Sequence, residues 1–269
     1  REISTGPRSG QNLKLPIGPG NQFVRRVFSR GDWALNGRFY GGWWQQIDSE
    51  LRKRIHINDV PTVEVDFKGL HVNLLSILAG AGKIEGDPYD LPENHLEGID
   101  RRQQRKYLKY LVLASINARD KKSAFRAFRD NYPRGDPGKT FTNTVLGALL
   151  EEFLARTPQL REGLFADQGI RLMKLDSDIA ERVLCYFTAK EVPVLGIHDS
   201  FIIDYRYGKE LKTQMMEASF SVVGERLDLS NNYVGLDELP EERKEDYVFI
   251  RKLERTASYR ERMRWFEER

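Results

Sequence analysis

The 269-residue chain has few of the residues that stabilise small proteins through disulfides or structural metal sites. It contains one cysteine, Cys185, so no disulfide can form within the chain. Because this residue lies in an apolar stretch that is predicted to be helical, we expect a buried thiol in a reducing compartment. His56, His71 and His95 do not follow metal-ligand spacing, and a structural zinc site is therefore not expected.

Long apolar runs are also missing. None approaches the roughly 20 residues that are needed to span a bilayer, which argues against an integral membrane protein. The first residues, Arg1–Thr5, lack the apolar core of a signal peptide, so we expect a cytoplasmic protein. The sequence has no internal repeat and no low-complexity segment, and its 40% apolar content is enough for a substantial core.

The net charge is small, but the positive charge is unevenly distributed. The chain has 43 Lys and Arg against 40 Asp and Glu, a balance that excludes a disordered polyelectrolyte. Residues 101–140 alone carry twelve Lys or Arg and three Asp, and residues 1–60 carry ten basic and five acidic side chains. Such a concentration suits a polyanion such as nucleic acid or a nucleoside triphosphate. A solvated basic helix without a partner accounts for the charge equally well.

The hydrophobic pattern predicts a single α+β unit with a small antiparallel sheet. Alternating and β-branched segments predict strands at 62–67, 192–197 and 201–205. Helical periodicity predicts helices at 70–78, 99–118, 123–130, 142–155, 172–188 and 209–224. Residues 1–22, rich in Gly and Pro, predict an irregular arm, and the charged segment after Tyr247 predicts an amphipathic helix. No linker divides the chain.

Two aspartates lie among apolar strand residues. Asp66 ends the first predicted strand, and Asp199 lies in the predicted hairpin turn between the last two. A lone aspartate at a strand end is more often a turn or a helix cap. Side by side, however, two carboxylates form a hard oxygen site that suits Mg²⁺. Two such ions, about 3.5–4 Å apart, stabilise the attacking and leaving oxygens in phosphoryl transfer.

A third feature is a stripe along the predicted helix 99–118. Arg105, Lys109, Leu113 and Asn117 recur every four residues, which places them on one slowly drifting helix face. Two cations followed by an apolar residue can bind triphosphate oxygens and then pack against a base. An ordinary amphipathic helix with a basic exposed side has the same pattern.

The order of these features resembles the A, B and C motifs of the family A DNA polymerases and the single-subunit phage-type RNA polymerases. The A-like motif is Val65–His71, VDFKGLH; the B-like motif is Arg105–Ala118, RKYLKYLVLASINA; the C-like motif is Gly196–Phe201, GIHDSF. Upstream, Gly37–Arg38 and Gln45–Ile47 resemble the stretch that precedes motif A. The resemblance covers about residues 37–225.

This resemblance implies a fold and a set of site residues. The fold would be a polymerase palm with reduced helical fingers at about 95–160, without a full thumb or exonuclease domain, following a basic arm at 1–36. Asp66 and Asp199 would hold two Mg²⁺ ions, for which Mn²⁺ can substitute, and Lys109 would protonate the leaving pyrophosphate. The implied partners are nucleoside triphosphates and a nucleic-acid primer-template, for which DNA is the first choice.

The resemblance also implies two groups of binding residues. The incoming nucleotide would contact Arg105, Lys109, Leu113, Asn117 and His71. Primer and template would contact Arg38, Gln45, His198, Arg101 and Arg102.

Several positions depart from the family pattern. Asn117 stands where both families usually have Tyr, and Leu113 where the DNA enzymes have Phe. His71 replaces the Glu that excludes the ribose 2′-hydroxyl in DNA polymerases, and Ser200 matches the RNA enzymes. From the three motifs in order, we nevertheless expect template-dependent nucleotidyl transfer by a DNA polymerase of family A type. A phage-type RNA polymerase or primase-like enzyme and a non-catalytic nucleic-acid-binding module are the alternatives.

Overall fold

The computed structural model describes residues 20–58 and 60–232. Their strands are β1 Arg25–Ser29, β2 Asp32–Tyr40, β3 His56–Ile57, β4 Val60–Phe67, β5 Val194–Ile197, β6 Ser200–Asp204 and β7 Leu229–Asn232. Their α-helices are α1 Ser49–Arg52, α2 Leu70–Leu78, α3 Arg101–Asn117, α4 Lys121–Asp130, α5 Asn143–Arg156, α6 Gly169–Ala189 and α7 Gly208–Val223. Short 3-10 helices cover Trp43–Gln45, Pro137–Lys139, Pro158–Gly163 and Tyr205–Tyr207.

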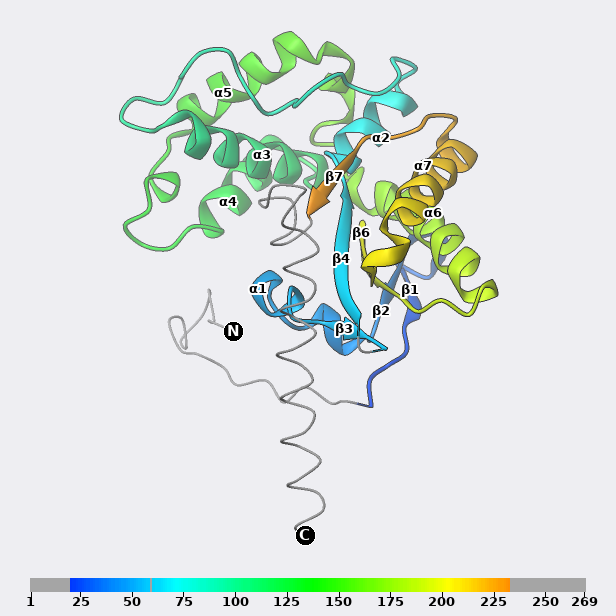
Figure 1. The fold of residues 1–269 in the computed structure, drawn as a ribbon. Helices are drawn as coiled ribbons and strands as arrows, with labels where there is room; N and C mark the ends of the chain where they lie inside the picture. Colours follow the sequence, from blue (N-terminus) through cyan, green and yellow to red (C-terminus); the bar gives the residue numbers. More distant parts are fainter. Residues whose placement is uncertain (1–19, 59, 233–269) are drawn as a thin grey trace, which may run out of the picture.

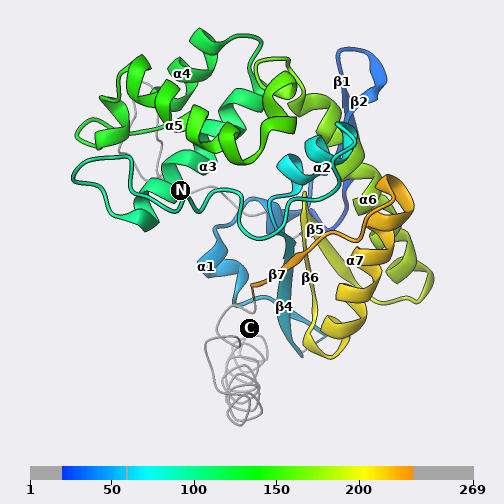
Figure 2. The same cartoon turned by 90° about the horizontal axis from the view of Figure 1, so that it is seen from above.

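A small antiparallel sheet forms the centre of the molecule (Figure 1). Its strand order is β3-β4-β6-β5, and β7 pairs with β4 beside β3; β1 and β2 form a separate hairpin. Helices α6 and α7 lie on one side of the sheet, whereas α3, α4 and α5 are grouped beyond one end of β4 (Figures 1 and 2). The predicted α+β class with a small antiparallel sheet is confirmed.

Strand β4 separates an apolar face from a polar one. Val63, Val65 and Phe67 are buried in the main core with residues from α2, α3 and α6. Thr62, Glu64 and Asp66 alternate with them and therefore point to the other face. Packing of the helices on the apolar face thus leaves a row of polar groups along β4 facing the opposite side.

Side-chain caps fix where the helices begin. The carboxylate of Asp100 accepts a hydrogen bond from the Gln103 amide, and that of Asp120 accepts one from the Ser123 amide. Such caps satisfy backbone N–H groups that have no partner within the helix. They set the starts of α3 and α4 close to the predicted 99 and 123.

Some elements differ from the prediction. The sequence did not predict five of the elements: β1, β2, β3, α1 and β7. The predicted boundary between the basic arm and the palm, between residues 36 and 37, falls inside β2. The expectation of a buried Cys185 is wrong: its side chain is exposed, because α6 buries Val183 and Phe187 on another face. Residues 1–19 of the predicted arm and the predicted helix after Tyr247 lie outside the described residues. Within the described part, no helix is long and apolar enough to cross a membrane.

Candidate active site

The strand register brings the two predicted aspartates to the same end of the sheet. In the antiparallel pair β4–β6, Asp66 lies opposite Ser200, the residue after Asp199. The amide of Phe67 donates a hydrogen bond to the Asp199 carbonyl over 3.4 Å. Asp199 belongs to the predicted turn between β5 and β6, which the structure forms as a hairpin.

Burial disfavours the charged form of both carboxyl groups. Burial, with a further contribution from Asp199, raises the pKa of Asp66 to about 8, while nearby Lys109 acts in the opposite direction. Burial and the Asp176 carboxylate raise the pKa of Asp199. The Oδ1 atom of Asp66 is buried without a hydrogen-bond partner. A buried carboxylate oxygen without a donor is costly unless a cation or ligand reaches it.

The donor set suits a hard cation but is small. Carboxylate oxygens are the ligands that Mg²⁺ prefers, and this ion is commonly held by one or two carboxylates together with substrate phosphates and water. Within residues 20–58 and 60–232, no group of three or more His, Cys, Asp or Glu side chains is arranged to hold a metal. The pair of aspartates therefore fits an ion that is shared with a phosphate-bearing substrate.

A cavity of about 370 Å³ opens beside Asp66. Arg105 and Lys109 of α3 line it together with Asp66. The other lining residues come from the end of β4 and the turn before α2, from the loop before α3, and from β7 and the segment before it: Phe67, Lys68, Gly69, Gly86, Asp87, Pro88, Tyr89, Asp228 and Ser230. The A-like and B-like motifs, which are separated in the sequence, thus meet at one cavity.

Arg105 is engaged by a carboxylate inside this cavity. Its Nε donates to Asp87, and its guanidinium lies 6.0 Å from the Tyr89 ring centre. One helical turn earlier, Arg101 Nη2 donates to Asp90 over 3.0 Å. Arg102 is exposed in the first turn of α3. A phosphate group entering the cavity would compete with Asp87 for Arg105.

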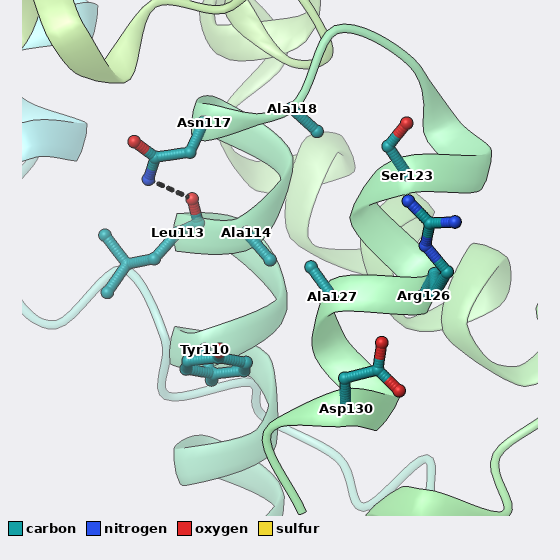
Figure 3. Close-up of a pocket in the computed structure, with 9 residues that line it drawn as sticks. All are labelled: Tyr110, Leu113, Ala114, Asn117, Ala118, Ser123, Arg126, Ala127 and Asp130. Atoms are coloured by element: carbon teal, nitrogen blue, oxygen red, sulfur yellow. Dashed lines mark hydrogen bonds between the residues drawn. The ribbon is translucent and has the colours of Figure 1, made fainter. Parts of the chain in front are cut away.

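Leu113 and Asn117 lie further along α3, beside a different pocket. This groove, with a volume of about 480 Å³, runs between α3 and α4 and is lined by residues of both helices. In the close-up, Leu113 and Asn117 point away from α4, whereas Ala114 and Ala118 face it (Figure 3). The Asn117 side-chain amide donates to the Leu113 carbonyl over 2.7 Å. The predicted stripe is therefore continuous on α3 but extends beyond the cavity.

Near Asp199, the buried Asp176 holds the half-buried Arg38 and His71 in a charge cluster. Arg38 Nε donates to Asp176 over 2.6 Å, and Arg38 Nη2 lies 3.1 Å from His71 Nε2. The Asp176 side chain is 2% exposed and comes from α6. Arg38 from β2 and His71 from α2 are thus held side by side next to Asp199, but neither lines the cavity at Asp66.

His198 and Gln45 have well-defined surroundings. His198 has a positive φ of 57°, its ring packs edge-on to Tyr40 at 5.1 Å, and burial lowers its pKa. A positive φ is uncommon outside glycine, although His, Asn and Asp adopt it more readily than other residues, and it fits a tight turn. The Gln45 side-chain amide donates to the carbonyls of Phe39 and Gly196, each over 2.9 Å. It therefore ties β2 to β5.

Sequence reasoning missed Asp176, Asp87 and Glu64. Asp176 interrupts the apolar face of the helix predicted at 172–188, a signal that could have identified it. Glu64 lies two residues before Asp66 on the same strand face, accepts two hydrogen bonds from Arg52 and accepts one from the Ser200 hydroxyl over 2.9 Å. Asp87 is in an irregular loop, where no periodic pattern marks it.

Comparisons with known proteins found no matching family model and no similar curated protein. One solved structure with a similar arrangement is the POL domain of Pol1 from M. smegmatis in complex with DNA primer-template and dNTP, at a TM-score of 0.48 and 11% sequence identity. The match covers 77% of this chain and 46% of that one. The chain thus spans less than half the length of that polymerase domain.

Proposed function

We propose that this chain catalyses template-dependent nucleotidyl transfer to the 3′ end of a nucleic acid, as a compact DNA polymerase of family A type. The observation that carries the proposal is the convergence of three sequence motifs. Asp66, Arg105 and Lys109 line one cavity, and the β4–β6 register sets Asp199 beside Asp66. In the proposed assignment the sheet is the palm and α3–α5 are the fingers.

The cavity suits a nucleoside triphosphate because two cations of α3, Arg105 and Lys109, line it together with the Asp66 carboxyl group. Arg105 and Lys109 would bind the phosphates, and Lys109 would donate a proton to the leaving pyrophosphate. Arg38 and His198 would contact the primer terminus. Positioning and charge neutralisation dominate phosphoryl transfer, so a few well-placed groups are enough. Asp66 and Asp199 would hold Mg²⁺, which when bound supplies electrostatic stabilisation of the reacting phosphate oxygens.

The test is primer extension with either the four dNTPs or the four rNTPs, on DNA and RNA templates, with Mg²⁺ or Mn²⁺. We expect dNTP incorporation on a DNA template. Asp66→Asn and Asp199→Asn should each reduce the rate at least about a hundredfold, comparable to the loss of a strong electrostatic group from an active site. Asp178→Asn is the matched control, because this carboxylate is on α6 and pairs with Arg26 and Lys174.

Each alternative has its own outcome. Ser200 and the absence of Glu at position 71 favour a phage-type RNA polymerase or primase-like enzyme, which would incorporate rNTPs in preference to dNTPs. A binding module would bind primer-template but incorporate nothing under any condition. The burial of Asp66 and Asp199, with Asp199 further disfavouring the charge of Asp66, argues against the module, because unused buried carboxyl groups only destabilise the fold.

A further inference from the structure

The tip of the β1–β2 hairpin carries an exposed tryptophan, Trp33, which is held by a contact with Phe28 and by a tight turn. Trp33 is 77% exposed, and its ring contacts Phe28 edge-on with the ring centres 4.6 Å apart. The hairpin turns through Arg30 and Gly31, which have φ values of 55° and 69°. Two successive positive φ angles match the twist of the flanking strands, so the turn is tight and well defined.

Two arginines from distant parts of the chain meet at this tip. Arg30 Nη1 lies 2.8 Å from Asp167 Oδ2, and Arg119 Nε lies 3.4 Å from the same oxygen. The Asp167 amide also donates to the Ala118 carbonyl, which joins this loop to the end of α3. Two guanidinium groups thus share one carboxylate, and their side chains remain 46% and 75% exposed.

Both elements that form this surface lead back to the candidate active site. Strand β2 runs from Trp33 at the tip to Tyr40, whose ring packs against His198. Helix α3 runs from Lys109, at the cavity, to its end just before Arg119. Ten residues at 1.5 Å each make this distance about 15 Å. Because a stacked strand advances about 3.4 Å per nucleotide, a strand that followed α3 would span this distance in about four nucleotides.

We propose that Trp33, Arg30 and Arg119 form a subsite for the unpaired template strand ahead of the reaction centre. Trp33 stacks on a base, and the two arginines contact phosphates. The inference rests on the proposed function, because only a copying enzyme has an unpaired template at that point. Beyond the incoming nucleotide, template bases have no partner and their faces are free to stack. An exposed aromatic ring beside cations is the usual means of binding single strands.

Binding of labelled primer-templates without nucleotide tests the subsite. Template overhangs of one, three, six and ten nucleotides are compared by fluorescence anisotropy. We expect the Kd of the wild type to fall at least about fivefold between one and six nucleotides, the lower end of the effect of one base-stacking aromatic, and to change little beyond six. Trp33→Ala and Arg119→Ala should lose most of this gain and bind the one-nucleotide overhang normally. Arg119→Ala should also reduce the salt slope by about 0.7.

Phe220→Ala and Arg161→Ala are matched controls, since Phe220 is 46% exposed on α7 and the Arg161 side chain is 56% exposed. Neither should alter the dependence on overhang length. An equal loss on short and long overhangs, or no loss in Trp33→Ala, would overturn the subsite. A wild type that incorporates nucleotides but binds independently of the overhang overturns this inference alone. A wild type that shows the overhang dependence but never incorporates a nucleotide overturns the proposed function instead.

Discussion

At Asp66 the fold keeps a carboxylate where its charged form is disfavoured. Burial and Asp199 raise its pKa to about 8, whereas an aspartate in an unfolded chain titrates near 3.9. The folded protein therefore holds a proton that the unfolded chain releases. The stability that this proton provides is fully present below about pH 4 and is lost as the pH rises to about 8. Such a cost is consistent with a group that is kept for chemistry.

Asp66→Asn is accordingly expected to stabilise the protein in EDTA, by an amount that grows from pH 5 to pH 9. The neutral amide of Asn does not ionise, so the difference in the free energy of unfolding between variant and wild type follows the titration of the Asp66 carboxyl group. For a chain of this size, each kcal/mol raises the Tm by about 2–4 °C. Thermal unfolding at pH 5, 7 and 9 measures the difference. A gain of the same size at all three values would contradict the assignment of the raised pKa to Asp66.

Asp87 forms an ion pair with Arg105, one of the cations expected to bind phosphate. The side chains are 35% and 41% exposed, so the pair is weak and a triphosphate can displace it. Asp87→Asn should lower the KM for the nucleotide about three- to tenfold, because release of one carboxylate from its partner costs about 1 kcal/mol. Steady-state primer extension measures this. Asp90→Asn is the control, since Asp90 pairs with Arg101 outside the cavity; an equal effect of both variants would indicate general electrostatics.

At the scale of elements, Gly37 determines how the β1–β2 hairpin docks on α6. Its φ is 85°, and a Cβ there would lie 2.9 Å from Ser177 Oγ and 3.0 Å from Arg26 Nη2. Gly37→Ala should destabilise the protein by about 2 kcal/mol, through backbone strain and crowding together. Gly31 has a φ of 69° with nothing within 4 Å, so Gly31→Ala should cost only about 1 kcal/mol. Urea unfolding compares the two; equal costs would show that the docking contact contributes nothing.

The sequence predicts the helices better than the strands, since even the nine-residue strand β2 was not expected. Helix 70–78 has the observed bounds, and the helices at 99–118 and 142–155 lie within two residues of theirs, because their apolar faces repeat over several turns. β3, with two residues, and β7, with four, are too short to show a pattern. Both form through pairing with β4, a long-range interaction that local sequence does not encode.

The same limit applies to the candidate site. Asp66, Arg105 and Lys109 could be selected because local motifs mark them, and they line one cavity. Asp87 could not, because its meeting with Arg105 depends on the path of an irregular loop. The partners of Arg38 were equally unpredictable, since Asp176 follows it by 138 positions and meets it only through packing of β2 on α6.

For the molecule as a whole, the charge count overstates the free positive charge of residues 101–140. Arg101, Arg105, Arg119 and Lys139 each have a carboxylate within 4 Å. Exposed pairs of this kind are weak but reduce the field seen by a distant polyanion. The predicted interaction with nucleic acid therefore depends on cations such as Lys122 and Arg126, which are exposed on α4.

Two lysines should consequently behave differently. Lys109 lines the cavity with Asp66, so Lys109→Ala should reduce kcat about a hundredfold, the lower end for loss of a general acid, with little change in the Kd for primer-template. Lys122 is exposed away from that cavity, so Lys122→Ala should weaken binding on every sequence and reduce the salt slope by about 0.9 per lost phosphate contact. Rapid-quench kinetics and binding titrations from 50 to about 200 mM salt separate the two effects. If both variants weaken binding alone, the basic region is a general polyanion surface and Lys109 has no part in the chemical step.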